Sequence, residues 1–193
     1  MYIAFEGIDT VGKSTQIDRL AARFPGCVVT KEPGGTPLGE KLRAIILDEG
    51  GLEPRAETLL FLADRAQHSE RVIRPNLGKL ILSDRSLLSG IAYAHVLQGY
   101  AVDTLLQLNR FATGELFPDA VVLFTIDEAS LKSRLGGKAH DAIEKRGIGY
   151  MMRVQKVLEE LCDLLEIDHL AIDATLPVET VTDTITPFIK ERL

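Results

Sequence analysis

The stretch FEGIDTVGKST, residues 5–15, decides the fold of this chain of 193 residues. It connects a short apolar run, YIAF (2–5), to an amphipathic segment, STQIDRLAARF (14–24). The apolar run predicts a buried strand, and the amphipathic segment predicts a helix. We therefore expect the stretch to form the loop of a strand–loop–helix unit.

The spacing within this loop, Gly7-x-x-x-x-Gly12-Lys13-Ser14, is typical of a phosphate cradle. Glycine permits backbone geometry that a side chain would obstruct, and the backbone N–H groups at the start of the helix then point at phosphate oxygens. Lys13 can reach the β- and γ-phosphates, and the Ser14 hydroxyl can ligate Mg²⁺. We predict a nucleoside triphosphate site. The alternative is a chance glycine-rich turn, which the complete pattern between a strand and a helix argues against.

Short apolar runs alternate with helical patterns along the whole chain. Continuous apolar runs suit strands that are covered on both faces, as in a parallel sheet. The expected strands are 2–5, 27–30, 79–83, 120–126 and 169–172, and the expected helices are 14–24, 36–51, 54–74, 87–98, 102–114, 128–135, 148–166 and 178–192. The pattern predicts a three-layer α/β fold of the P-loop type. A mostly parallel, five-stranded sheet would be flanked by helices in one domain spanning residues 1–193.

Individual residues mark where some of these elements begin and end. Thr36 is a candidate helix cap with Pro37 at the first helical position, and Pro75 is expected to end the long helix from Pro54. The segment GGKAHDAIEKRG (136–147) is bounded by glycines, polar and rich in charge. We expect this segment to be a mobile lid.

The composition is that of a globular protein, with 46% hydrophobic residues, 26% charged residues and a net charge of −6. This charge argues against a broad surface for nucleic acid or membranes. Glu6 interrupts the first apolar run, which also lacks the basic start of a signal peptide. No apolar stretch reaches the roughly 18 residues of a membrane span. Cys27 and Cys162 lack metal-ligand spacing and are expected to be buried thiols. We expect a cytoplasmic protein.

The segment SDRSLLSG (83–90) directly follows the third expected strand. In a parallel α/β sheet, the carboxyl ends of the strands open on the ligand crevice. Asp84 is therefore placed to hold Mg²⁺ through water, and Arg85 to bind a phosphate. A surface ion pair is the alternative interpretation of these two residues.

Two further segments carry candidate acceptor residues. TKEPGGTPLGEKLR (30–43) has a rigid Pro-Gly-Gly turn and Arg43, a forked donor for phosphate, although alone it would indicate an exposed turn. In LLFLADRAQH (59–68), Phe61 and Arg65 are four residues apart and share a helix face. An aromatic ring beside a guanidinium can stack on a base and donate to its edge, but spacing alone favours Phe61 as a core residue.

Taken together, FEGIDTVGKSTQ, TKEPGGTPLGEKLR, FLADRAQH, SDRSLLSGIAYA and IDATLPVETV resemble, in this order, the motifs of the thymidylate kinase family. The resemblance covers essentially the whole chain. It implies transfer of the γ-phosphoryl group of ATP to dTMP, giving dTDP and ADP for dTTP biosynthesis, with Mg²⁺ as the cofactor. It also implies a homodimer.

The resemblance assigns roles by position. It implies ATP binding by Gly7, Ile8, Asp9, Thr10, Val11, Gly12, Lys13, Ser14, Thr15, Asp173, Ala174 and Thr175. It implies dTMP binding by Asp9, Glu32, Pro33, Arg43, Phe61, Arg65, Arg85, Ser89, Gly90 and Tyr93. It implies catalysis by Lys13, Asp9 and Arg85, and metal binding by Ser14 and Asp84.

Chemistry supports several of the implied roles. Phe61 would stack on thymine, and Arg65 would donate to its O4 carbonyl, where cytosine presents an amino donor instead. Arg43 and Arg85 would clamp the acceptor phosphate, and Tyr93 would crowd a ribose 2′-hydroxyl.

The chain departs from the family in the residues that usually supply a catalytic arginine. The phosphate loop has Thr10 and Val11, and the expected lid has Ala142 where many members have arginine. We expect Lys138 or Arg134 to take this role, although a lysine cannot fork across two oxygens. The alternative is that both are solvated charges of the lid.

Other interpretations remain open on the sequence alone. A P-loop kinase for another small acceptor would need a different sequence after the second strand than EPGGT. A guanine nucleotide switch would normally carry an N-K-x-D motif, and none occurs. A dTMP-binding protein with weak catalysis is compatible with Ala142. Gly90 stands where some members have a polar residue, so thymine contacts on that side are expected to be fewer.

Overall fold

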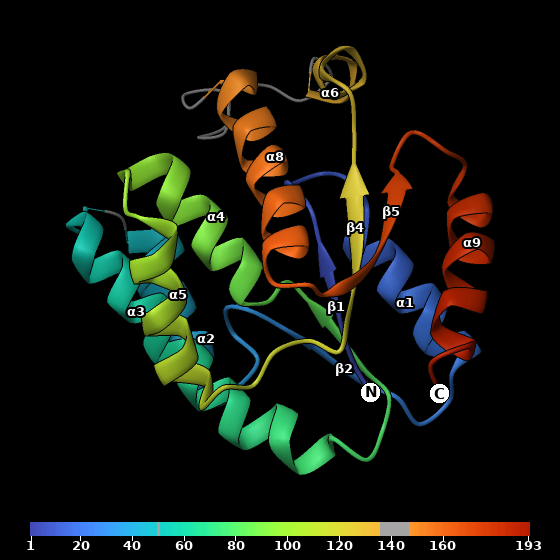
Figure 1. Cartoon of the computed structure of the whole chain (residues 1–193), viewed down its shortest axis with the longest axis horizontal. Helices are drawn as coiled ribbons and strands as arrows, with labels where there is room; N and C mark the ends of the chain where they lie inside the picture. Colours follow the sequence, from blue (N-terminus) through green and yellow to red (C-terminus); the bar gives the residue numbers. More distant parts are fainter. Residues whose placement is uncertain (50, 136–146) are drawn as a thin grey trace.

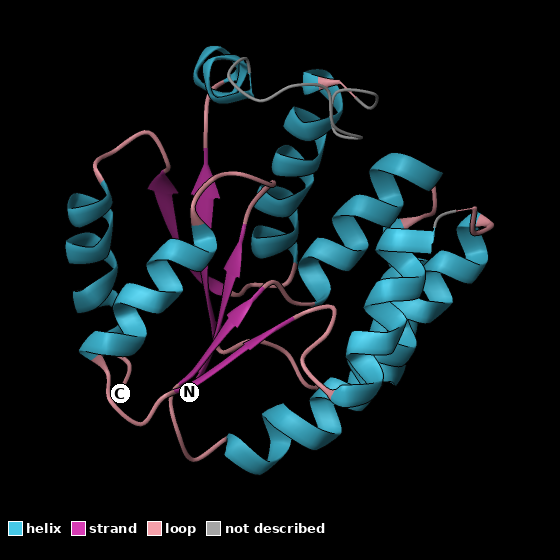
Figure 2. Ribbon diagram, turned by 180° about the vertical axis from the view of Figure 1, so that it is seen from behind, coloured by secondary structure: helices cyan, strands magenta, loops and turns pink. Residues whose placement is uncertain are grey.

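The computed structural model describes residues 1–49, 51–135 and 147–193. The expected lid, 136–147, lies outside the described residues apart from Gly147, and so do Lys138 and Ala142. Figures 1 and 2 show a twisted sheet with helices packed on both of its faces.

The central sheet has five parallel strands in the order β2-β3-β1-β4-β5. The strands are β1 (Tyr2–Glu6), β2 (Val28–Lys31), β3 (Ile81–Asp84), β4 (Ala120–Thr125) and β5 (Asp168–Asp173). Every residue of β1 is buried, as its continuous apolar run predicts for a strand at the centre of a covered sheet. The predicted α/β fold with a parallel sheet is confirmed.

The helices are α1 (Lys13–Arg23), α2 (Pro37–Ala44), α3 (Pro54–His68), α4 (Leu87–Gln98), α5 (Val102–Thr113), α6 (Glu128–Leu135), α8 (Ile148–Leu164) and α9 (Val178–Lys190). Helices α1 and α9 lie together on one side of the sheet, and α4 and α8 lie together on the other (Figure 1). Helix α3 packs against α2, α4 and α5, on the side of the molecule where β2 forms the edge of the sheet. Within the described residues, no helix is long and apolar enough to cross a membrane.

The expected single helix from 54 to 74 is wrong only in its last six residues, 69–74. α3 ends at His68, a π-helical turn (η2, Ser69–Ile73) follows, and a 3₁₀ turn (η3, Arg74–Asn76) contains Pro75. Proline has no backbone N–H, and its ring clashes with the carbonyl four residues earlier in an α-helix, so the last two turns adopt other hydrogen-bond patterns. A second π-helical turn (η1, Ile45–Glu49) continues α2.

Two predicted helix starts are borne out by their capping contacts. Thr36 caps α2, accepting a hydrogen bond from the Gly39 N–H at 2.9 Å, and Pro37 occupies the first helical position. Ser86 caps α4, and Gly99 ends it in the left-handed conformation with φ of 72°. The α4 cap fixes where the residues of its first turn point.

The strand register brings the ends of β1, β2 and β3 together. Phe5 of β1 pairs with Asp84 of β3, and Asp84 also pairs with Lys31 of β2. The loops that follow these strands therefore emerge at one edge of the sheet, where ligands bind in open α/β folds. Below this edge lies the core, in which the rings of Phe5 and Phe124 are 6.3 Å apart.

Candidate active site

The loop between β1 and α1 requires glycine at its first position. Gly7 has φ of 143°, and a Cβ there would lie 2.8 Å from the carbonyl oxygen of Phe124 on β4. Because L-residues rarely adopt this conformation and the neighbouring backbone cannot yield, only glycine fits. The first glycine of the sequence pattern is therefore explained by its backbone conformation and by the packing of this loop against β4.

Lys13 lies at the start of α1, folded inward against the loop. Its Nζ donates to the carbonyl oxygens of Gly7 at 3.1 Å and Ile8 at 2.8 Å, and its side chain is buried. Burial, followed by the nearby Arg85 cation, lowers the pKa of Lys13 to about 8. The ammonium is thus held at the loop where a phosphate chain would be cradled.

Ser14 and Asp84 form the part of the site that could hold a metal ion. The Ser14 hydroxyl donates to Asp84 Oδ2 at 2.7 Å. Hydroxyl and carboxylate oxygens are ligands that Mg²⁺ prefers, and Mg²⁺ usually takes the rest of its shell from phosphates and water. The described residues contain no group of three or more His, Cys, Asp and Glu that could hold a metal by themselves. The donor set therefore fits a magnesium ion that arrives with a nucleotide.

Arg85 connects the phosphate loop to the region beyond β3. Its Nη2 donates to Asp9 Oδ1 at 2.5 Å, and its Nη1 donates to Gly7 O at 3.1 Å and Ser89 Oγ at 2.8 Å. The guanidinium carbon lies 5.2 Å from the centre of the Tyr93 ring. Burial alone would lower the pKa of Arg85, but Tyr93 and Asp9 raise it above its ordinary value. Arg85 is a permanent cation at the junction of two sites.

A buried carboxylate holds the first turn of α4 in place behind Arg85. Glu6 is fully buried and accepts hydrogen bonds from the hydroxyls of Ser86, at 2.7 Å, and Ser89. Burial raises the pKa of Glu6. Because the Ser89 proton is donated to Glu6, the Ser89 oxygen can accept from Arg85.

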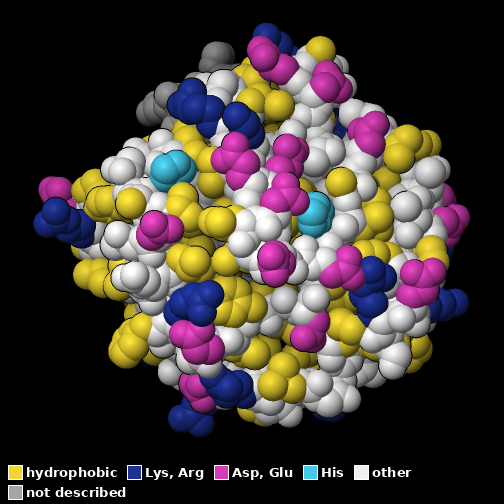
Figure 3. Space-filling view, in the orientation of Figure 1, with side chains coloured by type: hydrophobic (Ala, Val, Ile, Leu, Met, Phe, Trp, Pro, Cys, Tyr) yellow, Lys and Arg dark blue, Asp and Glu magenta, His cyan; other side chains and the backbone are white. Residues whose placement is uncertain are grey.

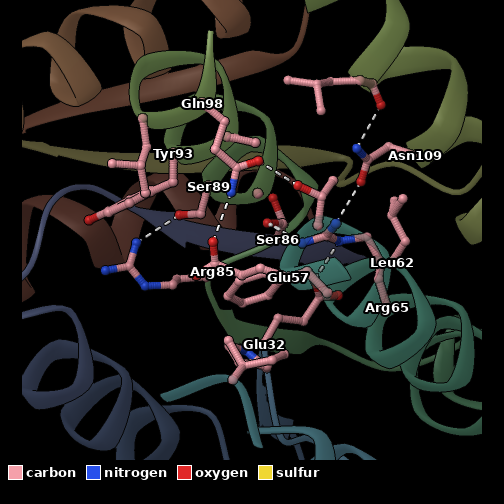
Figure 4. A pocket seen from close by; sticks show the side chains of 18 of the residues that line it. Glu32, Glu57, Leu62, Arg65, Arg85, Ser86, Ser89, Tyr93, Gln98 and Asn109 are labelled. Carbon is pink, nitrogen blue, oxygen red and sulfur yellow. Dashed lines mark hydrogen bonds and ion pairs between the residues drawn. The ribbon is translucent and has the colours of Figure 1, made fainter. Parts of the chain in front are cut away.

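A cavity of about 410 Å³ opens next to this cluster, between α3, α4, α5 and α8 (Figure 4). Every residue that the sequence predicted for the acceptor lines it: Asp9, Glu32, Pro33, Arg43, Phe61, Arg65, Arg85, Ser89, Gly90 and Tyr93. The cavity thus carries cations at Arg43, Arg65 and Arg85 and aromatic rings at Phe61 and Tyr93. Such a lining suits an anionic ligand with a flat, polar ring.

Arg65 lies buried in the wall of this cavity. Its Nε donates to Glu32 Oε2 at 2.8 Å, and its Nη1 donates to Asn109 Oδ1 at 2.6 Å. Its Nη2 lies 2.6 Å from where a Cβ of residue 90 would be. Gly90 therefore leaves the volume that the guanidinium fills, which gives a structural reason for glycine at this position.

The Glu32 carboxylate lies between two basic side chains, the guanidinium of Arg65 and the imidazole of His68. His68 Nδ1 lies 2.8 Å from Glu32 Oε1, and His68 Nε2 lies 2.6 Å from the Thr30 hydroxyl. Burial would raise the pKa of Glu32, but Arg65 and His68 outweigh it and the pKa is lowered. A Cβ at Gly35 would lie 2.5 Å from the His68 ring, so the glycine turn packs directly on the imidazole. The EPGGT segment is fixed by these contacts.

Arg43 lies on α2 at another part of the wall. Its Nη1 donates to the carbonyl of Pro33 at 3.0 Å, and its aliphatic stem packs against Gly34. Phe61 of α3 and Tyr93 of α4 contribute aromatic rings to the lining. The Tyr93 ring makes an edge contact with Tyr150 of α8, with ring centres 6.2 Å apart.

The predicted nucleotide-binding segment after β5 lies beside the phosphate loop. Arg134 of α6 donates to the carbonyl of Thr10 at 3.3 Å and to the carbonyl of Ala174. Asp173 accepts from the Thr175 N–H at 2.8 Å and the Thr175 hydroxyl at 2.6 Å, and these bonds lower the pKa of Asp173. Arg134 does not line the acceptor cavity; its guanidinium connects the two segments predicted to contact ATP.

Several lining residues were not predicted from the sequence. They are Ile46, Leu47, Glu57, Thr58, Leu62, Ser86, Ala94, Leu97, Gln98, Leu105, Asn109, Tyr150 and Met151. Within this lining, Gln98 donates to Glu57 at 2.8 Å and accepts from Thr58 at 2.7 Å (Figure 4). Asn109 carried one weak signal, a polar residue on the face of α5 that also buries Leu105 and Thr113.

Comparison with known proteins agrees with the resemblance seen in the sequence motifs. Residues 5–185 match the family model described as Thymidylate kinase. A thymidylate kinase of Sulfurovum sp. (strain NBC37-1) is 47% identical over 98% of this chain and 100% of its own. That of Aliarcobacter butzleri (strain RM4018) is 47% identical over 100% of both chains. That of Wolinella succinogenes is 49% identical over 94% of both.

Proposed function

The chain belongs to the thymidylate kinase family, and we propose that it transfers the γ-phosphoryl group of ATP to dTMP, giving dTDP and ADP. The observation that carries this proposal is the cavity of about 410 Å³, which meets the phosphate loop where Arg85, after β3, pairs with Asp9 of the loop. One ligand in the cavity and one in the cradle would meet at this pair. The geometry suits a transfer between two phosphates.

We assign the donor site to the loop 7–15 and to Asp173, Ala174 and Thr175. The backbone N–H groups of the loop and the ammonium of Lys13 would bind the phosphate chain. Arg134, which bonds the carbonyls of Thr10 and Ala174, ties the two segments together. We propose that this is its role here, in preference to contact with the transferred phosphoryl group.

Ser14 and Asp84 would hold Mg²⁺, Ser14 directly and Asp84 through water. When bound, the ion neutralises charge on the phosphates. The hydrogen bond of 2.7 Å between the two side chains supports a shared site.

The acceptor would lie with its phosphate between Arg43 and Arg85 and its base at Phe61 and Arg65. Asp9, held by Arg85, would contact the sugar 3′-hydroxyl, and Tyr93 would crowd a 2′-hydroxyl. Because the dTMP phosphate is already an anionic nucleophile, no general base is needed. The side chains contribute by aligning two phosphates and offsetting their charge.

We also propose a cytoplasmic homodimer that binds neither nucleic acid nor membranes. The net charge of −6 supports the absence of binding to nucleic acid and membranes, whose surfaces are also negative. For the dimer, the support is exposed apolar surface on two helices that pack against each other: Leu59 of α3 is 59% exposed, and Phe111 of α5 is 90% exposed. Hydrophobic side chains are frequent on the left of Figure 3, where α3, α4 and α5 lie.

The first experiment is a coupled ADP-release assay with ATP and Mg²⁺, comparing dTMP, dUMP, dCMP and dGMP with a control that has no acceptor. Turnover selective for dTMP is expected. Tight dTMP binding without turnover would show an intact acceptor cavity in a protein that has lost the catalytic charge. Turnover with another monophosphate in preference to dTMP would overturn the proposal.

A further inference from the structure

The base-reading arginine of the proposed acceptor site is held by three separate parts of the chain. Its Nε donates to Glu32 after β2, its Nη1 to Asn109 on α5, and its Nη2 to the carbonyl of Ser86 at 3.4 Å. Arg65, Glu32 and Asn109 are all buried. The guanidinium is therefore fixed before any ligand arrives.

Asn109 is suited to this contact because its own orientation is determined. Its Nδ2 donates to the carbonyl of Leu105 at 2.7 Å, so Oδ1 is the atom that faces Arg65. Asn109 is only 2% exposed, and Figure 4 shows it meeting the guanidinium from the α5 side. A flip of the amide would set a donor against a donor.

Within the part of the chain that the structure describes, these three contacts leave two N–H groups of the Arg65 guanidinium unused. An arginine has five such donors and accepts nothing. A carbonyl at position 4 of a pyrimidine could accept from them, whereas an amino group at that position would present a donor to a buried cation. The direction in which the free donors point is set by the bonds that hold the other three.

We propose that Asn109 is a positioning residue that sets selectivity for 4-oxo pyrimidines by holding Nη1 of Arg65. This inference rests on the proposed dTMP kinase activity, because it needs a pyrimidine in the cavity. Asn109 lies in the lining of the cavity, but the role proposed here is to hold Arg65 and not to contact the base. Its effect passes through Arg65.

The test is the replacement Asn109→Leu, which keeps the size and the helix but removes the acceptor. The KM for dTMP should rise at least about ten-fold, because a bond to a buried charge is lost. The KM for ATP should stay within about two-fold, and the ratio of kcat/KM for dTMP over dCMP should fall. Asn109→Asp, which keeps an acceptor for Nη1, should recover most of the dTMP affinity.

A matched control is Thr113→Val, one turn along the same buried face of α5. Among the described residues, the Thr113 hydroxyl bonds the carbonyls of Asn109 and Arg110, at 3.0 and 3.4 Å, and Thr113 is not among the residues that line the cavity. The KM values of the Thr113→Val variant for dTMP and ATP should match those of the wild type, even if its melting temperature is lower. A purely structural role for Asn109 would likewise lower the folded fraction and the apparent kcat without changing the KM for dTMP.

The outcomes separate the two proposals. A dTMP KM for Asn109→Leu within two-fold of the wild type, or an equal rise in both KM values, would overturn the role of Asn109 while leaving the kinase activity in place. A wild-type protein that binds dTMP in calorimetry without turning it over still permits the comparison through dissociation constants. A wild-type protein that neither binds nor phosphorylates dTMP would overturn the proposed function and, with it, this inference.

Discussion

Ser14 and Asp84 meet where β3 ends and α1 begins, with the hydroxyl of one donating to the carboxylate of the other at 2.7 Å. The sheet register accounts for this, since Asp84 pairs with Phe5 at the point where the chain enters the phosphate loop. Two residues 70 positions apart thus form one oxygen-rich site.

If this site holds Mg²⁺ through Asp84, then Asp84→Asn should raise the Mg²⁺ concentration needed for half-maximal activity by about 10–100-fold. Removing the metal with EDTA should stop turnover in the wild type. The measurement is initial rate against Mg²⁺ at saturating ATP and dTMP. Asp183→Asn, an exposed carboxylate on α9, is the control and should behave as the wild type. An unchanged Mg²⁺ requirement in Asp84→Asn would remove Asp84 from the metal site.

The lowered pKa of Lys13, about 8 against an ordinary 10.5, predicts opposite effects on activity and stability. As pH rises through 8, the free protein loses the ammonium, so kcat/KM for ATP should fall. Between about 8 and 10.5 the unfolded chain holds more protons at this residue than the folded one, so Lys13 makes the free energy of unfolding rise with pH.

Rates and urea unfolding measured from pH 7 to 10 would check both effects. Lys13→Arg keeps its charge and should lose the decline in kcat/KM through this range, whatever its basal rate. Lys13→Met should lose the corresponding gain in stability. A flat wild-type profile for kcat/KM would contradict a lysine titrating near pH 8.

Gly90→Ala should impair dTMP binding with little effect on folding. Alanine is favoured over glycine within a helix by about 1 kcal/mol, but its Cβ would lie 2.6 Å from Nη2 of Arg65. The tip of the arginine can move, which would displace the N–H donors that we propose bind the base. The KM for dTMP should rise about ten-fold or more, with the KM for ATP unchanged. Gly78→Ala, with open space around its Cβ, should change neither.

If the protein forms the proposed dimer through the exposed apolar side chains of α3 and α5, a charge placed there should break it. Phe111→Asp places a charge on a side chain that is 90% exposed in the single chain, so folding should be unaffected. Sedimentation should show a dimer for the wild type and a shift to monomers for this variant. Asp103→Asn at the start of α5 is the control, and a wild-type monomer at micromolar concentration would contradict the dimer.

The strands were predicted well from the sequence because each is a short, continuous apolar run, which is typical of a strand buried in a parallel sheet. The start of β3 is an exception: the expected strand began at 79, but the Lys79 N–H closes a turn onto Asn76 at 2.8 Å, so pairing begins at Ile81. The break after His68 was also missed. In residues 69–73 the backbone N–H groups bond to different carbonyls than they would in an α-helix. Amino-acid composition does not distinguish these two hydrogen-bond patterns.

The site was predictable where residues follow strand ends and not where helices are brought together by packing. Asp9, Asp84 and Arg85 lie in segments fixed by the sheet, so their motifs also give their places. Asn109 and Tyr150 reach the cavity only because α5 packs on α3 and α8 packs on α4. No spacing within the sequence encodes those contacts.

The packing of α1 against α9 has a consequence for synthesis. Gln16 donates to the carbonyl of Val178 at 2.9 Å and accepts from Thr182 at 2.7 Å, and Arg23 pairs with Asp183. These partners are 160 or more residues apart. At 5–20 residues per second, a ribosome needs about 10–30 s between making one helix and the other. During that interval the nascent chain carries its phosphate-binding helix with one flank uncovered, a window in which a chaperone can bind it.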